Sequence, residues 1–257
     1  MELFNKTVLI TGAAGRIGSA IASKVLENGG TVLLTDIDKE RLTCFRDQFL
    51  GKFQANIYLI FADITTSEGI EKLLDECLNY VPSIDCAIHS AYPKSKGWGT
   101  KFEDLNQDNL DNDLSMQLGG AIMFSQKILK YFLEQNKGNL IHISSILGFN
   151  APKFDHYEGT EMTSPIEYSA IKAGIISITK WLAKYYSEKN IRINCISPGG
   201  ILDNQPESFL NKYKKSCSNI GMLSAEKHIS GIVMFLLSDS SLAINGQNII
   251  VDDGWSL

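Results

Sequence analysis

Apolar residues gather in seven short runs that are rich in β-branched side chains and are separated by longer segments. The runs are residues 7–11, 31–36, 56–63, 84–90, 139–145, 191–197 and 247–253. Within each run successive positions are apolar, which is typical of parallel strands that helices cover on both faces. The pattern therefore predicts a parallel sheet of about seven strands.

The segments between these runs carry apolar residues at the 3.6-residue period of amphipathic helices. The predicted helices are residues 16–29, 38–50, 67–80, 106–136, 166–189 and 225–238. Strands that alternate with helices indicate an α/β fold, a doubly wound parallel sheet in three α/β/α layers. No linker, repeat or low-complexity segment divides the chain, so we expect residues 1–257 to form a single domain.

Two connections interrupt this alternation, at residues 146–165 and 199–224. Loops of this length without secondary structure of their own are uncommon and often serve as lids. Both follow predicted strands, and loops that leave the carboxyl ends of parallel strands line the ligand crevice of such a sheet. We therefore expect both connections to border a binding site.

Composition and charge narrow the classes of function. The 257 residues are 44% hydrophobic and 21% charged, with a formal net charge of −5, so the chain lacks the basic surface of a nucleic-acid partner. No apolar run approaches the roughly 18 residues of a membrane span, and no basic-then-apolar leader precedes the first strand, so we expect a cytoplasmic protein. Five scattered cysteines and four dispersed histidines predict reduced thiols and no metal site.

A strand, a glycine-rich turn and a helix follow one another in TVLITGAAGRIGSAIA, near the N-terminus. Glycines in such a turn let the backbone bend sharply and approach a pyrophosphate, which the N-terminus of the helix attracts. Incidental glycines are the alternative, but the position directly after the first strand favours a dinucleotide site. The turn residues predicted to bind this cofactor are Gly12, Gly15, Arg16, Ile17 and Gly18.

The second predicted strand ends in a carboxylate, Asp36, 18 residues beyond Gly18. A carboxylate at this point accepts hydrogen bonds from the adenosine ribose and repels a 2′-phosphate, which favours NAD over NADP. Turn formation is the alternative role for Asp36. The nearby Arg16, Lys39 and Arg41 keep NADP open as the second choice.

Tyr168 and Lys172 are four residues apart in EYSAIKAG, at the start of a predicted helix. Four residues make about one helical turn, so both side chains project from nearly the same face. A free phenol has a pKa of about 10 and is a poor base at neutral pH. A neighbouring ammonium and an oxidised nicotinamide favour the phenolate and lower that pKa. The phenolate can then take a hydroxyl proton while hydride leaves the same carbon. On a surface helix, the pair could also arise by accident.

The order and spacing of these pieces resemble the short-chain dehydrogenase/reductase family over nearly the whole chain. The matching segments are TGAAGRIG, Asp36, ADI at 62–64, HISSILG at 142–148, YSAIK, RINCISPGG at 192–200 and INGQNIIVDDG near the C-terminus. The resemblance implies a Rossmann-type fold. It also implies an NAD(P)-dependent oxidoreductase that acts on CH–OH groups.

The same resemblance implies roles for individual residues. Tyr168 would be the general acid/base, Ser145 would hydrogen-bond the reacting oxygen, and Lys172 would also hold the nicotinamide ribose. For Ser145 the alternative is a strand-end hydroxyl that satisfies the local backbone. The further residues implied to line the cofactor are Asp63 and Ile64 at the adenine, Ser90 and Ala91 through their backbone, and Pro198 and Ile201 at the nicotinamide.

Three positions depart from the family's pattern. The usual Asn-Asn-Ala-Gly after the fourth strand is replaced by residues 89–92, His-Ser-Ala-Tyr, so that Tyr92 stands where glycine is usual. Gln117 aligns with the asparagine that relays protons through water, and we count it among the candidate substrate residues. Asp203 stands where the family has a threonine that contacts the cofactor.

Within the family, residues 151–172 and 195–210 look most like the flagellin-modification protein A group. Those oxidoreductases are encoded with pathways for sialic-acid-like nine-carbon sugars of bacterial surfaces. We therefore expect hydride transfer between NAD and a secondary alcohol or ketone of a sugar derivative. A sugar epimerase or dehydratase with tightly bound NAD is the first alternative. The second is a non-catalytic cofactor-binding module, which would not need all of Ser145, Tyr168 and Lys172.

Ser145 and Tyr168 are 23 residues apart, farther than most family members place these two roles. The added residues are polar and aromatic, and His156 and Tyr157 are the candidate contacts to a polyhydroxylated substrate; a solvated loop without function is the alternative. The predicted helices 106–136 and 166–189 carry more apolar positions than one sheet face needs. Since the corresponding helices pair in the family, we expect a homodimer or homotetramer.

Overall fold

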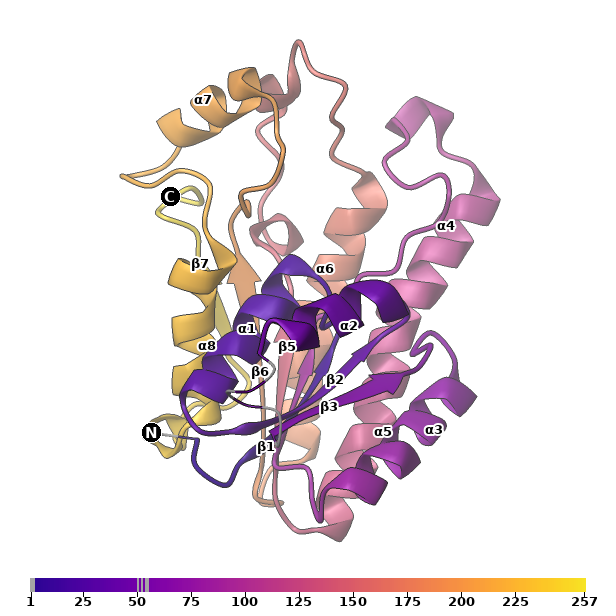
Figure 1. Cartoon of the computed structure of the whole chain (residues 1–257). Coiled ribbons are helices and arrows are strands. Elements are labelled where there is room, and N and C mark those ends of the chain that lie inside the picture. Colours follow the sequence, from indigo (N-terminus) through magenta and orange to yellow (C-terminus); the bar gives the residue numbers. More distant parts are fainter. Residues whose placement is uncertain (1–2, 50, 52, 54–55) are drawn as a thin grey trace.

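The computed structural model describes residues 3–49, 51, 53 and 56–257. One sheet of seven parallel strands forms its centre, in the order β3-β2-β1-β4-β5-β6-β7 (Figure 1). The strands are β1 (Thr7–Thr11), β2 (Thr31–Asp36), β3 (Ile57–Phe61), β4 (Cys86–His89), β5 (Gly138–Ile143), β6 (Ile191–Pro198) and β7 (Asn248–Val251). The predicted fold class, a doubly wound parallel sheet of seven strands, is confirmed.

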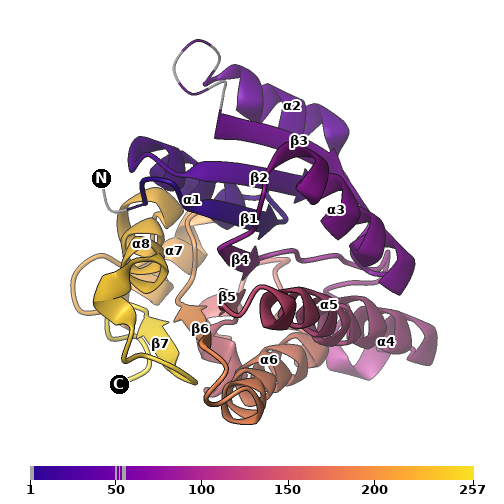
Figure 2. The same cartoon turned by 90° about the horizontal axis from the view of Figure 1, so that it is seen from below.

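Helices cover both faces of this sheet, as the view in Figure 2 shows. One face packs against α1 (Arg16–Glu27), α2 (Lys39–Asp47) and α8 (Ser230–Leu237). The other packs against α3 (Ser67–Tyr80), α5 (Gly120–Glu134) and α6 (Ile166–Tyr185). Because both faces are covered, strands such as β1 and β4 are buried at every position, which explains their unbroken apolar runs.

The segment predicted as one helix over residues 106–136 contains two helices and a wider turn between them. Asn106 caps α4 (Gln107–Asp113), its side chain accepting from the backbone N–H of Asn109 at 3.0 Å. A π-helical turn, Leu114–Gly119, then leads into α5. Such turns occur often at functional sites, and this one buries Gln117.

The two long connections are more ordered than predicted. The second contains α7 (Glu207–Lys215), and the first contains a short 3-10 turn at Phe154–Tyr157. The expectation that these connections lack secondary structure was therefore wrong. The pattern was missed because the apolar residues of α7, Phe209 and Tyr213, face the first connection and Trp255 instead of the sheet.

Two helix ends also differ from prediction. The helix predicted over 166–189 ends at Tyr185, and Glu188 and Asn190 adopt left-handed backbone with φ of 69° and 53°, which cannot continue a helix. The helix predicted over 38–50 ends at Asp47, and its last predicted residue lies outside the described part of the chain.

Large apolar side chains remain on the outer faces of α5 and α6, among them Ile122, Trp181 and Tyr185. They belong to the helices on which we expected a second copy of the chain to pack. In the described part of the chain, no helix combines the length and the apolar character needed to span a membrane.

Candidate active site

The glycine turn after β1 brings the backbone close to two other segments. Gly12 has φ of +64°, and a Cβ there would lie 2.7 Å from the Cα of Ala91. A Cβ on Gly18 would collide with the carbonyl oxygen of Gly12. Gly15 precedes α1 and no side chain caps this helix, so the N–H groups of its first turn are left for an anion. The turn therefore fits a pyrophosphate.

The ends of β1 and β4 are joined by side-chain hydrogen bonds. Thr11 Oγ1 accepts from the backbone N–H of Ser90 at 3.2 Å and of Ala91 at 3.3 Å, and Ser90 Oγ donates to the Thr11 carbonyl at 2.7 Å. These bonds place Ser90 and Ala91 against the glycine turn, where a backbone contact to a dinucleotide is possible.

Asp36 lies at the end of β2, beside the same turn. Its carboxylate accepts from the backbone N–H of Ala14 at 3.0 Å and of Asp38 at 3.1 Å. The residue is half-buried, and a carboxylate can accept about four hydrogen bonds, so two remain for ribose hydroxyls. Asp36 thus shapes the turn and can also face a ribose.

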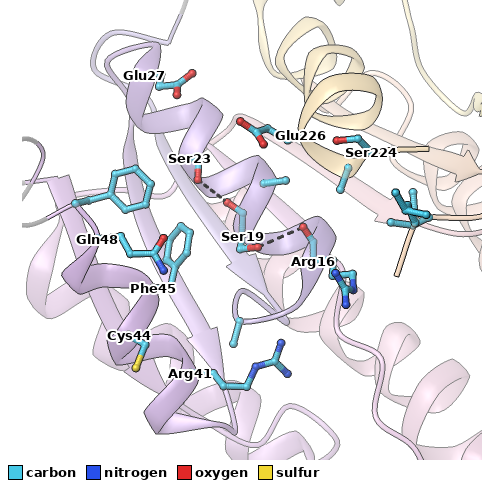
Figure 3. A pocket seen from close by; sticks show the side chains of 16 residues that line it. Arg16, Ser19, Ser23, Glu27, Arg41, Cys44, Phe45, Gln48, Ser224 and Glu226 are labelled. Carbon is cyan, nitrogen blue, oxygen red and sulfur yellow. Dashed lines mark hydrogen bonds between the residues drawn. The ribbon is translucent and has the colours of Figure 1, made fainter. Parts of the chain in front are cut away.

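A pocket of about 740 Å³ extends from the glycine turn along the outer side of α1, towards α2 (Figure 3). In this view the guanidinium groups of Arg16 and Arg41 lie at the end near the turn, and Glu27 lies at the other end. Arg16 forms an ion pair with Asp203, in the loop after β6. The carboxylate that replaces the family's threonine is therefore bound to the first residue of α1.

The other predicted cofactor residues lie on loops at the carboxyl ends of the strands. Asp63 follows β3, and its carboxylate accepts from the backbone N–H of Thr65 at 2.9 Å and from the Thr65 hydroxyl at 2.7 Å. Ile64 is buried beside it. Pro198 ends β6, and Ile201 forms a short bridge with Leu223. The fold brings these positions to the edge of the sheet that carries the glycine turn.

The predicted catalytic residues come together between β5 and the first turns of α6. Lys172 Nζ lies 5.6 Å from the centre of the Tyr168 ring and donates to the carbonyl of Ile143 at 3.0 Å. Ser145, at the end of β5, hydrogen-bonds the Tyr168 phenol. Ser144 Oγ donates to the backbone carbonyl of Lys172 at 2.8 Å and so fixes α6 to β5.

The ionisation of this pair differs from the expectation. Burial raises the pKa of Tyr168; the hydrogen bond with Ser145 opposes that rise, and nearby Tyr157 adds to it. Burial lowers the pKa of Lys172 to about 8, with a smaller opposing effect from the Cys195 thiol. The protein groups alone therefore do not lower the Tyr168 pKa, because both the phenol and the ammonium are desolvated.

The three candidate substrate residues have different surroundings. Gln117 is 3% exposed, and neither atom of its amide finds a hydrogen-bond partner among the described residues. Tyr157 packs on Phe209 at a ring distance of 5.2 Å and also lines a second cavity. Both side chains can therefore still face a ligand.

His156 is not among the residues that line that cavity, and its role as a substrate contact stays a prediction. The side chain is 2% exposed and shares a hydrogen bond of 2.9 Å between Nε2 and Ser216 Oγ. Its ring packs against Phe209, Tyr213 and Trp255 at 5.6–6.1 Å. The imidazole therefore fastens the connection after β5 to α7 and the C-terminal segment.

The second cavity, of about 680 Å³, lies between the connection after β5 and residues 100–103. Its walls carry aromatic and aliphatic side chains beside polar ones, among them Phe102, Phe154, Tyr157, Met162, Lys101, Asn150 and Ser169. Ile166 and Ser169 also line it and flank Tyr168 in the first turn of α6. The cavity thus adjoins the first turn of α6, although Ser145, Tyr168 and Lys172 are not among its lining residues.

Sequence reasoning missed two aromatic side chains around the Tyr168 phenol. The Tyr92 ring lies 5.7 Å from that of Tyr168, and the Trp98 ring lies 6.1 Å from it. Asp113 is buried and holds the segment between them, accepting from the backbone N–H of Ser95 at 2.8 Å and from its hydroxyl at 2.7 Å. The tyrosine at the usual glycine position was the available signal.

Comparison with known proteins identifies the family. A family model described as enoyl-(acyl carrier protein) reductase matches residues 12–256. A solved short-chain dehydrogenase from Leptospira borgpetersenii serovar Hardjo-bovis, with bound NAD+, is similar with a TM-score of 0.87 and 31% identity; the match covers 100% of this chain and 94% of that one. The chain belongs to the short-chain dehydrogenase/reductase family.

Curated relatives support this assignment to the short-chain dehydrogenase/reductase family. Post-translational flagellin modification protein A of Campylobacter coli is 42% identical over 99% of this chain and 100% of its own length. A 7alpha-hydroxysteroid dehydrogenase of Bacteroides fragilis is 28% identical, over 98% and 95%. The protein is thus an NAD(P)-dependent oxidoreductase that acts on hydroxyl or keto groups, and the resemblance to the flagellin-modification group is confirmed.

Proposed function

We propose that this short-chain dehydrogenase/reductase transfers hydride between NAD and a secondary alcohol or ketone of a sugar derivative, in the biosynthesis of nonulosonate-type sugars of the bacterial surface. The observation that carries the proposal is the arrangement of Ser145, Tyr168 and Lys172 between β5 and α6. The first turn of α6 also borders the cavity of about 680 Å³. The 42% identity to a flagellin modification protein supports this choice of pathway.

The glycine turn and α1 would hold the pyrophosphate of the coenzyme, Asp36 its adenosine ribose and Lys172 its nicotinamide ribose. When bound in its oxidised form, the nicotinamide ring accepts a hydride and carries a positive charge. Ser145 donates to or accepts from the reacting oxygen and orients it towards Tyr168. Tyr168 then takes the hydroxyl proton in the oxidative direction and returns it in the reductive direction.

The phenol must lose its proton for the oxidative step, although burial raises the Tyr168 pKa. In the loaded enzyme, the positive charge of the nicotinamide would oppose this effect. Gln117 lies on the π-helical turn where the family has an asparagine, and its unpartnered amide can hold a water molecule that exchanges protons with solvent.

The mostly apolar wall of the cavity also carries polar groups. The connection after β5 supplies Tyr157, Thr163 and Ser164 to its wall, and residues 100–103 supply Lys101 and Glu103. Hydroxyl and charged groups of this kind suit a substrate with several hydroxyls, and an aromatic ring can cover a sugar face.

The central test follows NADH absorbance while hexoses, their phosphates and their nucleotide derivatives are screened with the wild-type enzyme. In the same assay, Tyr168→Phe should lose at least about a hundredfold in turnover, because it lacks the ionisable oxygen. Binding of NAD, measured by calorimetry, should stay within twofold. Near-normal turnover by this variant would eliminate Tyr168 as the acid/base. Product formed without net NADH would favour the epimerase or dehydratase alternative.

The preference for NAD is a second prediction and rests on Asp36. The carboxylate already bonds the turn, so a 2′-phosphate placed at the ribose would meet its negative charge. Calorimetric titration should show NAD binding at least about tenfold more tightly than NADP, and Asp36→Ala should narrow this ratio. The exposed Arg41 is the competing cation, and tighter binding of NADP by the wild-type enzyme would overturn the assignment.

A further inference from the structure

Tyr92 occupies a position at which the family has glycine, and its ring enters the catalytic centre. The ring lies 5.3 Å from that of Trp98 and 5.7 Å from that of Tyr168, both edge to face. The ammonium of Lys172 lies over the Tyr92 ring, with Nζ 5.3 Å from the ring centre. One aromatic side chain that glycine would not supply thus touches both members of the catalytic pair.

Lys172 is a buried cation without a carboxylate partner. The residue is 6% exposed, and within the described part of the chain it takes part in no ion pair. Its Nζ has one neutral acceptor, the carbonyl of Ile143 at 3.0 Å. A buried ammonium in such surroundings loses its proton readily unless another group stabilises the charge.

The ionisable groups that face Lys172 from the neighbouring strands do not supply a negative charge at neutral pH. Burial raises the pKa of the Cys195 thiol on β6 to about 12. The His142 imidazole on β5 has its pKa lowered to about 4, and that of His89 on β4 is also lowered, by burial and by the charge of Lys172. On α6 itself, the Tyr168 phenol is neutral as well. The Tyr92 and Tyr168 rings lie against the ammonium itself and present their electronegative faces to it.

The Tyr92 phenol is held in its neutral form. Burial raises its pKa, and the nearby Tyr168, Asp113 and Glu167 raise it further, whereas the hydrogen bond with Trp98 opposes the rise. Tyr92 is therefore no second base beside Tyr168. Lys94 also lies over this ring, at 4.8 Å, but it is exposed to water, which stabilises its charge without help from the ring.

We propose that Tyr92 is a positioning residue for Lys172: its ring stabilises the charged ammonium by a cation–π contact at a place where the family has glycine. Cation–π contacts are strongest where water is excluded, as it is around this ammonium. The importance of this contact for catalysis rests on the proposed function. Its physical content, the charge state of Lys172, does not depend on the identity of the substrate.

The test measures the titration of Lys172 without substrate or coenzyme. Trace amounts of acetic anhydride label the lysines competitively between pH 6 and pH 10, and peptide mass spectrometry follows the peptide that contains Lys172. Tyr92→Leu keeps an apolar side chain but lacks the π face, and should lower the midpoint of labelling by about one pH unit. Tyr92→Phe keeps the ring and should reproduce the wild-type midpoint.

Two further variants keep the result interpretable. Tyr80→Leu removes an exposed ring that stacks on Tyr58, far from the site in the fold, and should leave the midpoint unchanged. If Tyr92→Leu does not fold, which circular dichroism would show, the flexible Tyr92→Met takes its place. A wild-type midpoint in the folded Leu or Met variant overturns the proposal, and so does an equal shift in Tyr92→Phe, since the hydroxyl would then be responsible. Lack of activity on sugars would refute the proposed function and leave this measurement intact.

Discussion

At the scale of single residues, the role proposed for Lys172 works against the stability of the fold. Its ammonium is buried, and burial lowers its pKa from 10.5 to about 8. A cation whose pKa falls on folding destabilises the folded state at every pH at which the unfolded chain keeps it protonated. Active-site residues often carry such a cost, since the charge is needed for binding and chemistry.

We therefore expect Lys172→Met to be more stable than the wild type at pH 7, by about 1–2 kcal/mol. The gain combines about 1.4 kcal/mol per unit of the pKa shift with the loss of one hydrogen bond, to the Ile143 carbonyl. The wild type regains stability between pH 8 and 10.5, because its folded state has then lost the proton that the unfolded chain still binds. Urea unfolding at pH 7 tests whether the variant is the more stable protein. Urea unfolding at pH 9.5 tests whether the difference in stability has become smaller. A variant less stable than the wild type at pH 7 would contradict the argument.

The sequence identified some site residues and not others for a clear reason. Tyr168 and Lys172 are one helical turn apart, so local geometry alone places them together. The surroundings of His156 could not be predicted, because its partners, Ser216 and Trp255, lie 60 and 99 residues further along the chain. A polar residue in a long loop can face a ligand or another loop, and only the fold decides between the two.

At the scale of elements, the two central strands β4 and β5 carry a buried pair of imidazoles. The rings of His89 and His142 lie 5.7 Å apart. Ser125 Oγ donates its one proton to the Ala121 carbonyl at 2.7 Å. In the 3.2 Å contact between Ser125 Oγ and His142 Nε2, the imidazole is therefore the donor. His142 Nδ1 has no partner among the described residues, so protonation would bury an unsatisfied N–H.

This pair predicts a loss of stability in mild acid. The pKa of His142 falls from 6.5 to about 4 on folding, so its stabilising effect is complete above pH 6.5 and is lost as the pH falls towards 4. The loss amounts to about 3 kcal/mol at pH 4, with a further loss from His89, whose pKa is also lowered. Between pH 7 and pH 4.5, the thermal unfolding temperature should fall less steeply for His142→Gln than for the wild type. Parallel curves would show that the imidazole does not titrate.

The order of strands and helices followed from the apolar pattern, because each element buries its apolar face on the sheet. Where an element packs elsewhere, the same reasoning failed. Phe209 and Tyr213 of α7 bury their rings against Trp255 and the connection after β5. The helix therefore lacks the apolar face towards the sheet from which the other helices were predicted. The π-helical turn around Gln117 also continues the 3.6-residue pattern closely enough to read as one unbroken helix.

At the scale of the whole molecule, three segments distant in sequence form one cap over the carboxyl end of the sheet. The connection after β5, α7 and the C-terminal segment share an aromatic cluster that includes His156, Tyr213 and Trp255. Lys153 donates to the Trp255 carbonyl at 3.1 Å and lies over its ring at 4.7 Å. The glycine turn lies outside this cluster, so we expect the cap to control the substrate and not the coenzyme.

Lys212 supplies the polar link between α7 and the connection. Its Nζ donates to the backbone carbonyls of Asp155 at 2.6 Å and Glu158 at 3.2 Å, so one side chain holds the turn that carries Tyr157 into the cavity wall. Lys212→Ala should release this turn, raising the KM for a sugar substrate by about three- to tenfold while the affinity for NAD stays unchanged. Hydrogen exchange of residues 153–160 should accelerate in parallel, which can be measured without any substrate. Lys215→Ala removes an exposed lysine of the same helix and should leave both unchanged; equal exchange in the two variants would show that the cap does not depend on this link.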